Sequence, residues 1–234
     1  MHKTFCSAIY NYRGISAEDI PRQNAIKTHL PFRLIPWSEE AKYIYIARNP
    51  KDCCVSYYHH MRNIPHKGFK GNFDEFFKIF MTGKIHYEDY FDHLMELYEH
   101  RNDPNVLFMT YEQMQEDTEA AVLKMASFID DEKYSEPLRK DKEKLKNVVK
   151  LSSFKTMKEA AEKRVEKVLS VSEEEILSSD LSKGERMSFL RIRERSEASK
   201  DKNNSHIMNN IRKGIIGDWR NYFRGPKHTH GWEI

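Results

Sequence analysis

The sequence predicts an α/β fold in which a parallel sheet is flanked by helices, and two similar stretches carry that prediction. Residues 43–47 are β-branched and aromatic and short enough for a buried strand, and helix-initiating residues follow at once. Residues 106–111 form a second such strand, followed by apolar residues at helical spacing over 121–129. Two successive strand–helix units are typical of a parallel sheet covered by helices.

The turn after the first of these strands is suited to binding an anion. Asn49 is a good N-cap, Pro50 fits the first helical position, and Asp52 places negative charge in the first turn. Arg48 precedes them, where the end of a strand meets the unpaired amides of a helix. A guanidinium beside such amides can hold a phosphate or sulfate. A plain strand–helix unit with Arg48 on the surface fits the pattern equally well.

The segments around this turn are less regular. Residues 1–25 show no clear periodicity, and 27–31 are expected to be a short strand or its end, because Pro31 disfavours helix at the residue before it. Glycines and a proline over residues 63–72 predict a loop.

Further helices are expected over residues 73–81 and 87–100, whose aromatic side chains suit core packing. Residues 133–150 predict a charged helix with a few apolar anchors. Residues 158–209 are strongly charged and predict an insertion that is partly flexible and mostly a solvated face. The chain is interpreted as a single domain over residues 1–234.

Composition excludes several classes of function. Lys and Arg number 39 against 36 Asp and Glu, a net charge of +3, and the basic residues form no stripe with patterned aromatics, so nucleic-acid binding fits poorly. No apolar run approaches membrane-spanning length, and the N-terminus has no signal-peptide pattern, so no membrane partner is expected. Three cysteines give no plausible disulfide framework, which favours a reducing, cytoplasmic location.

Three motifs occur in a fixed order along the chain. They are Ile-Lys-Thr-His-Leu-Pro at 26–31, Arg-Asn-Pro-Lys-Asp at 48–52 with Ser56, and Arg-Lys-Gly-Ile-Ile-Gly-Asp-Trp at 212–219. Together they closely resemble the cytosolic sulfotransferase family, which uses the donor 3′-phosphoadenosine 5′-phosphosulfate. The third motif is specific, and the resemblance extends from about residue 14 to residue 223.

The resemblance implies a P-loop-NTPase-like sulfotransferase fold. The implied reaction moves a sulfuryl group from 3′-phosphoadenosine 5′-phosphosulfate to a hydroxyl or amine of a small molecule, such as a phenol. No His, Cys and carboxylate spacing suggests a metal site, so no metal is expected. The alternative is a catalytically silent nucleotide-binding module of the same fold, which acts by binding.

The motifs imply a grip on the 3′-phosphate of the donor. Arg48 and Ser56 match the family's first phosphate contact, and Arg212, Lys213 and Gly214 match the second. An arginine fork suits a phosphate, serine adds a neutral donor, and glycine lets the backbone approach closely.

The remaining matches concern the residues around the adenine and the group that removes the proton of the acceptor. Tyr111, Ser152 and Phe154 match positions around the adenine, although Phe154 fits a core residue as well. His29 matches the general base that takes the acceptor's proton, and Lys27 can stabilise developing charge on the sulfuryl group.

Two family features are not found. The family opens with a strand and a phosphate-binding loop, and nothing in residues 1–28 resembles them. The chain is therefore expected to lack the first strand and phosphate loop. It resembles an N-terminally truncated, arthropod-type member of the family, and whether it is active without that loop is left open. The dimerisation pattern after Trp219 is also disrupted, since Arg220 keeps only the charge and Arg-Gly-Pro at 224–226 replaces the rest, so a homodimer stays an open alternative.

Overall fold

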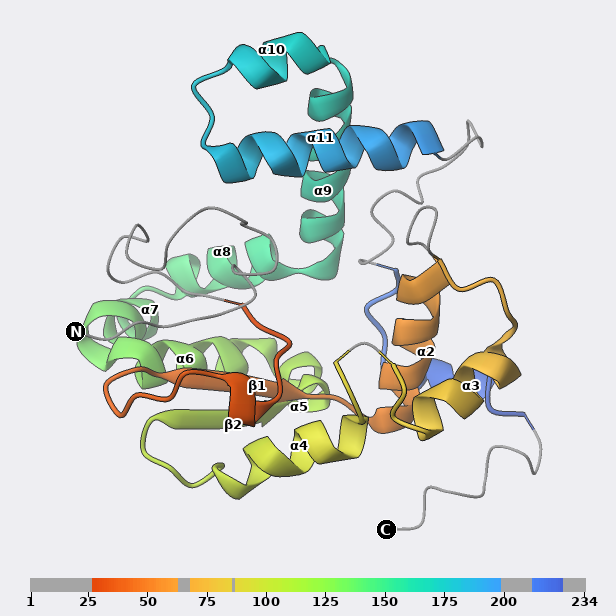
Figure 1. Ribbon diagram of the computed structural model, residues 1–234. Coiled ribbons are helices and arrows are strands. Elements are labelled where there is room, and N and C mark those ends of the chain that lie inside the picture. The colour runs from red at the N-terminus through yellow and green to blue at the C-terminus, as the bar shows by residue number, and fades with distance from the viewer. Residues whose placement is uncertain (1–26, 63–67, 86, 199–211, 225–234) are drawn as a thin grey trace.

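The computed structural model describes residues 27–62, 68–85, 87–198 and 212–224 (Figure 1). It is rich in helices, which surround a small sheet. In chain order the elements are the 3₁₀ helix η2 (Phe32–Leu34), strand β1 (Tyr43–Ala47), helices α2 (Pro50–Arg62), α3 (Phe73–Met81) and α4 (Tyr90–Glu99), strand β2 (Val106–Thr110), helices α5 (Tyr111–Glu116) and α6 (Thr118–Asp130), the π-helical turn η3 (Asp131–Ser135), helices α7 (Glu136–Lys140), α8 (Lys142–Ser152), α9 (Phe154–Leu169), α10 (Glu173–Ser178) and α11 (Lys183–Ala198), and the 3₁₀ helix η5 (Asp218–Asn221).

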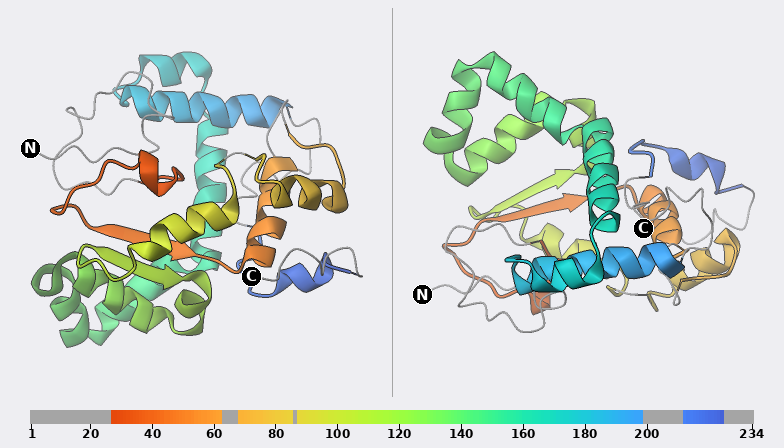
Figure 2. Two further views of the ribbon diagram at one scale, coloured as in Figure 1. Left: turned by 60° about the horizontal axis from the view of Figure 1, so that its bottom comes forward. Right: turned by 90° about the horizontal axis from the view of Figure 1, so that it is seen from above.

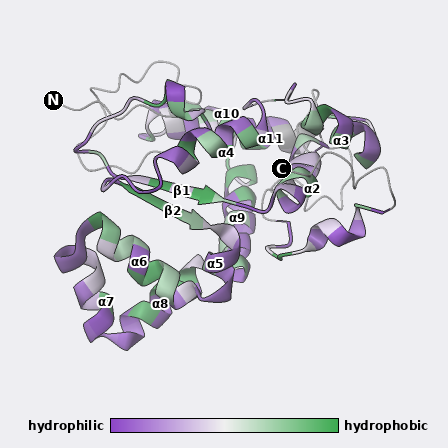
Figure 3. Ribbon diagram, turned by 90° about the horizontal axis from the view of Figure 1, so that it is seen from below, coloured by the Kyte–Doolittle hydropathy of each residue, from purple (hydrophilic) through white to green (hydrophobic). Residues whose placement is uncertain are grey.

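Strands β1 and β2 pair in parallel and form a two-stranded sheet within the described residues. The register runs from Tyr43 opposite Val106 to Ala47 opposite Thr110. Helices α4 and α6 lie on opposite faces of this sheet (Figure 1, Figure 3). The predicted α/β fold, a parallel sheet flanked by helices, is confirmed.

Each face of the sheet packs against a different helix. On one face Leu107 and Met109 of β2 pack with Ala121 of α6. On the other face the ring of Phe108 lies 5.4 Å from that of Tyr98 of α4, measured between centroids. Because side chains alternate along a strand, β2 contributes to both layers, and Figure 3 shows both strands as predominantly hydrophobic.

The main aromatic core lies beside the sheet, where α2, α3 and the C-terminal segment meet (Figure 2). Phe76 of α3 and Tyr58 of α2 are buried there, and Tyr222 and Phe223 pack against the same cluster. The prediction that the aromatic residues of the 73–81 helix serve the core is confirmed. This core fixes the C-terminal segment against α2.

Side-chain caps explain where the helices next to the sheet begin. Asn49 Oδ1 accepts hydrogen bonds from the backbone N–H of Lys51 (3.0 Å) and Asp52 (3.4 Å), as its cap pattern predicts. Thr110, the last residue of β2, forms a capping box with Gln113, so α5 starts directly after the strand. Both strands therefore end in a tight turn at the same edge of the sheet.

The expected strand over residues 27–31 is wrong. This stretch is irregular, because Thr28 Oγ1 accepts from the backbone N–H of Leu30 at 2.9 Å and Pro31 has no N–H for a sheet. No strand pairs with it in the part of the chain that the structure describes. It leads instead into η2.

Two predicted helices also have different bounds. The helix expected over 133–150 is divided into η3, α7 and α8, because Asp141 caps α8 by accepting from the N–H of Glu143 and Lys144. The helix expected over 87–100 begins at Tyr90, since Asp89 caps it. The charged segment from residue 158 to residue 198 forms the end of α9 and helices α10 and α11, joined by short turns, and residues 199–209 lie outside the described residues.

Helices α9, α10 and α11 form an extension with its own small core (Figure 1, Figure 2). Val168 and Ile176 are fully buried in that core, with Ile192 beside them. The charged residues of this segment are thus compatible with a packed structure. Within the described residues, no helix is long and apolar enough to cross a membrane.

Candidate functional site

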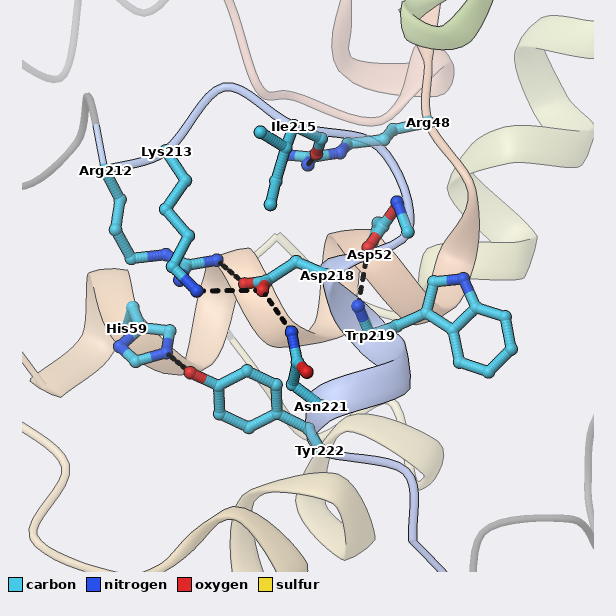
Figure 4. A network of polar contacts seen from close by, with 11 residues as sticks. Arg48, Asp52, His59, Arg212, Lys213, Ile215, Asp218, Trp219, Asn221 and Tyr222 are labelled. Atoms are coloured by element: carbon cyan, nitrogen blue, oxygen red, sulfur yellow. Dashed lines mark hydrogen bonds and ion pairs between the residues drawn. The ribbon is translucent and has the colours of Figure 1, made fainter.

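Residues 212–219, named here the C-terminal loop, run along the N-terminal half of α2 (Figure 4). Asp52, in the first turn of α2, is 1% exposed and accepts hydrogen bonds from the backbone N–H of Gly217 (2.6 Å) and of Trp219 (2.9 Å). Gly217 has a φ of +83°, a backbone conformation suited to glycine. Segments far apart in sequence are therefore joined by one carboxylate.

Arg48 lies where β1, β2 and the C-terminal loop meet. Its Nη2 donates to the carbonyl oxygen of Ile215 at 3.1 Å, and its guanidinium lies 4.5 Å from the centroid of the Tyr111 ring. Its Nε is buried and has no hydrogen-bond partner among the described residues. A buried N–H without a partner is costly, and an anionic ligand would supply the missing acceptor.

Asp218 forms ion pairs with the two basic residues at the start of the C-terminal loop (Figure 4). Its carboxylate is 1% exposed and forms ion pairs with Arg212 and with Lys213 Nζ, the latter at 2.9 Å. Asn221 Nδ2 donates to the same carboxylate at 2.9 Å. Burial alone raises the pKa of Asp218, but the hydrogen bonds from Lys213, Arg212 and Asn221 outweigh it and hold that pKa well below its usual range.

Beneath these cations, His59 of α2 hydrogen-bonds Tyr222 through Nε2 and the phenolic oxygen, at 2.7 Å. Burial, and after it the charge of Arg212, lower the pKa of His59 to about 4 against the opposing effect of Asp218. The imidazole is therefore neutral at neutral pH. Ser56 is half-buried and lies between Asp52 and His59 at helical spacing, on the face of α2 that carries both.

Gly214 and Phe154 are also in contact. Gly214 has a φ of +65°, and a Cβ built there would lie 2.4 Å from Cδ2 of Phe154. The ring of Phe154, the first residue of α9, thus lies against the C-terminal loop. This contact connects the extension of helices α9 to α11 with the residues around Arg48.

Ser152 lies differently from the other predicted nucleotide contacts. It is exposed, and its Oγ donates to the carbonyl oxygen of Val148 at 2.8 Å, within its own helix. The neighbouring Ser153 caps α9 by accepting from the N–H of Thr156. The Oγ of Ser152 also donates to the carbonyl oxygen of Val149 at 3.2 Å, so both of these hydrogen bonds lie within α8.

His29 lies in a second group of residues, next to α2 and α4. Its ring is 4.9 Å from that of Tyr87, between centroids. Burial lowers the pKa of His29 below the ordinary 6.5, and the charge of Lys27 lowers it further. His60 and His93 act in the same direction. A neutral imidazole beside an ammonium group can accept a proton and stabilise negative charge.

The segment that carries His29 is attached to the sheet by His93 of α4. The carbonyl of Leu30 lies 3.2 Å from Nε2 of His93, and the hydroxyl of Tyr45 lies 3.1 Å from Nδ1. A carbonyl can only accept, so Nε2 carries the proton and Nδ1 accepts from Tyr45. Burial raises the pKa of Tyr45 to about 12, so this phenol remains a donor.

The structure brings several of the residues predicted for the site close together. The sequence patterns did not identify Asp52 as a tertiary contact, Asp218 or His93. Asp52 was interpreted as a first-turn charge of its own helix, and its partners lie far away in the chain. Asp218 stands inside the third motif, whose spacing was the available signal. His93 gave no signal beyond its place in an amphipathic helix.

Chemically, the first group of residues can bind a phosphate and the second can move a proton. Within the described residues, no group of His, Cys, Asp and Glu side chains could hold a metal ion. Residues 1–26, on which the expected lack of a phosphate loop rests, lie outside the described residues, as do residues 225 and 226 of the altered dimer pattern. Arg220 packs on the Trp219 ring, at 4.6 Å from its centroid.

The sulfotransferase domain family model matches residues 11–189. The chain is 29% identical over 218 residues to the amine sulfotransferase of Oryctolagus cuniculus, covering 91% of this chain and 60% of that protein. It is 38% identical over 145 residues to the luciferin sulfotransferase of Photinus pyralis, covering 60% and 37%. The crystal structure of mouse sulfotransferase SULT7A1 complexed with PAP is similar, with a TM-score of 0.63 and 28% identity over 92% of this chain and 64% of that one. The chain thus spans less than two thirds of the length of each of these proteins.

Proposed function

Because this chain belongs to the sulfotransferase domain family, we propose that it transfers a sulfuryl group from 3′-phosphoadenosine 5′-phosphosulfate to a hydroxyl or amine of a small molecule. The observation that carries the proposal is the buried, unpartnered Nε of Arg48 beside the C-terminal loop. The N–H of that atom can donate a hydrogen bond to a phosphate oxygen of the nucleotide. Arg212 and Lys213 add positive charge on the same loop.

Sulfuryl transfer, like phosphoryl transfer, is an in-line displacement in which the protein mainly supplies position and charge. The 3′-phosphate gives the donor a handle away from the reacting sulfur. In this proposal Arg48 and Ser56 bind that phosphate from one side, and Arg212, Lys213 and the Gly214 backbone from the other. An arginine fork and close backbone amides are well suited to a dianion.

The adenine is assigned to the space near Tyr111 and Phe154. The Tyr111 ring already packs beneath the Arg48 guanidinium, and Phe154 contacts Gly214, so both aromatic rings border the proposed phosphate site. The bound nucleotide of the mouse relative, PAP, supports a nucleotide of this type. Ser152 remains part of the proposal, and reaching the adenine requires its hydroxyl to leave the carbonyl of Val148.

The proton of the acceptor is assigned to His29. Its lowered pKa keeps the imidazole neutral and able to accept a proton at neutral pH. Lys27 lies close enough to affect that pKa, so its ammonium group can stabilise charge that develops on the sulfuryl oxygens. The ring of Tyr87 beside His29 offers an apolar surface to a small aromatic acceptor such as a phenol.

We also propose a cytoplasmic location. The thiols of Cys53 and Cys54 are free, as is usual in a reducing compartment.

The test is a transfer assay with the full chain, a donor labelled in its sulfuryl group, and a panel of phenols, alcohols and amines. We expect label to appear in at least one acceptor, and the transfer to be lost in His29→Ala. A chain that binds adenosine 3′,5′-bisphosphate but transfers no label to any acceptor would favour the silent binding module. A chain that neither binds nor transfers would overturn the proposal.

A further inference from the structure

Asp52 is placed where an aspartate normally serves its own helix, yet it serves another segment. It is the third residue of α2, a position from which a carboxylate commonly interacts with the first-turn amides. Here the cap of α2 comes from Asn49 instead. Both oxygens of Asp52 accept from the C-terminal loop, Oδ2 from Gly217 N–H and Oδ1 from Trp219 N–H.

These two bonds are part of a series of contacts along one side of α2. Before them, Arg48 Nη2 donates to the carbonyl of Ile215. After them, His59 bonds with Tyr222. The central member, Asp52, is almost completely buried, so water competes little for its oxygens. Its geometry fixes both the distance and the orientation of the C-terminal loop relative to the first turn of α2.

We propose that Asp52 is the positioning residue of the phosphate site, which holds the C-terminal loop so that Arg212 and Lys213 face the same anion as Arg48. The inference rests on the proposed function and names a residue through which that site is assembled. Asp52 itself contacts no ligand in this account. Both of its oxygens are occupied by backbone amides, and a carboxylate would repel a phosphate.

Because Asp52 is negatively charged, a purely electrostatic role and a positioning role predict opposite effects of its removal on the affinity for phosphate. If Asp52 affected the site only through its charge, its removal would make the surroundings more positive and strengthen phosphate binding. If Asp52 positions the loop, its removal weakens phosphate binding even though the site becomes more positive. The two roles therefore predict opposite changes for the same substitution.

The substitution is Asp52→Asn, which keeps the shape but turns one oxygen into an NH₂ group facing a backbone N–H. Asp92 offers a matched control, because it is the third residue of α4 and is exposed. The affinities of the full chain and its variants for adenosine 3′,5′-bisphosphate and for adenosine 5′-phosphate are measured by calorimetry. Their ratio isolates the contribution of the 3′-phosphate.

We expect Asp52→Asn to lower that ratio by about tenfold or more, as when a charged hydrogen bond is lost, and Asp92→Asn to leave it unchanged. In an Arg212→Ala background the effect of Asp52→Asn should shrink, because the loop no longer presents that cation. A ratio that stays within about twofold of the parent, or that rises, would overturn the proposal.

Two outcomes need separate attention. If Asp52→Asn does not fold, Asp52→Glu tests the same point, since it keeps the charge and displaces the oxygens by one methylene. The ratio is expected to fall there too, and an unchanged ratio contradicts a positioning role. If the parent chain shows no preference for the 3′-phosphate at all, the proposed function fails, and with it the premise of this inference.

Discussion

The ring of Phe154 lies so close to the backbone of Gly214 that a Cβ at residue 214 would come within 2.4 Å of Cδ2 of the ring. The first turn of α9 and the C-terminal loop are therefore fitted to each other. Gly214 also has a φ of +65°, which adds backbone strain to any substitution. This contact is a direct consequence of the glycine.

Gly214→Ala should therefore destabilise the protein by about 1–3 kcal/mol through the unfavourable φ, with the clash as an additional cost. The free energy of unfolding in urea measures it. Replacing Phe154 by Ala in the Gly214→Ala background should recover part of the loss, since only the clash is relieved. Gly71 is the control: its added Cβ would also be crowded, by side chains of Phe69 and Glu75, but its φ is not positive, so Gly71→Ala should cost less. Equal costs at both glycines would contradict this explanation.

Arg48→Ala and Arg212→Ala should each weaken binding of adenosine 3′,5′-bisphosphate by roughly 2 kcal/mol, the loss of a charged hydrogen bond. Binding of adenosine 5′-phosphate should hardly change, because it lacks the group that these arginines are proposed to bind. Calorimetric titration with both nucleotides separates the two effects. Arg139→Ala, which removes an exposed pair with Asp131, is the control. Equal losses for the two nucleotides would show that these arginines do not bind the 3′-phosphate.

His29→Ala should lower the maximal rate of sulfuryl transfer by about 100-fold, the usual scale for a lost general base. The affinity for the donor should stay the same, which calorimetry checks. His100→Asn is a suitable control, because that histidine pairs with Asp103 and stacks on Phe32. A rate within a few-fold of the parent would remove His29 from the mechanism.

The pH dependence of transfer gives an independent test of the same residue. The pKa of His29 is lowered below 6.5, so the base stays deprotonated, and the rate should decline only at pH values below 6.5. Lys27→Met removes a positive charge that lowers this pKa, so the acid limb should move to higher pH. The profile of kcat/KM against pH measures both. An acid limb that does not move would indicate that another group titrates.

His59 should make the folded protein sensitive to acid. Its pKa is about 4 in the folded state against 6.5 for the free side chain, so the unfolded state binds the proton more readily. The stability that His59 contributes is complete above pH 6.5 and is lost progressively as the pH falls toward 4. His59→Asn should reduce the difference in thermal midpoint between pH 7.5 and pH 5, read by circular dichroism. A pH dependence of the thermal midpoint that is unchanged in His59→Asn would contradict the role of His59.

Local patterns were sufficient to predict the strand–helix units. The branched residues of 43–47 and the cap at Asn49 act within a few positions of each other, and the structure has β1 and α2 there. The stretch 27–31 failed as a strand because a strand needs a neighbour, which a local pattern does not contain. The break at Asp141 was overlooked because apolar spacing over 133–150 concealed a capping signal within it.

For the candidate site too, the sequence motifs revealed some residues, whereas contacts between distant segments became visible only in the folded structure. The motifs named Arg48 and Arg212, since their types and spacing are visible in the chain. The contacts of Asp52 with Gly217 and Trp219 depend on two segments that meet only after folding. A polar residue that bonds with distant backbone amides leaves little trace in a sequence.

The central claim is that the 3′-phosphate of the donor binds at Arg48 and the C-terminal loop. Its most direct test is a crystal structure of the full chain with adenosine 3′,5′-bisphosphate. The account predicts a 3′-phosphate oxygen at about 3 Å from the now unpartnered Nε of Arg48, with Ser56 and the Gly214 backbone around the same group. A nucleotide whose 3′-phosphate lies elsewhere, with that Nε still unpaired, would contradict the account.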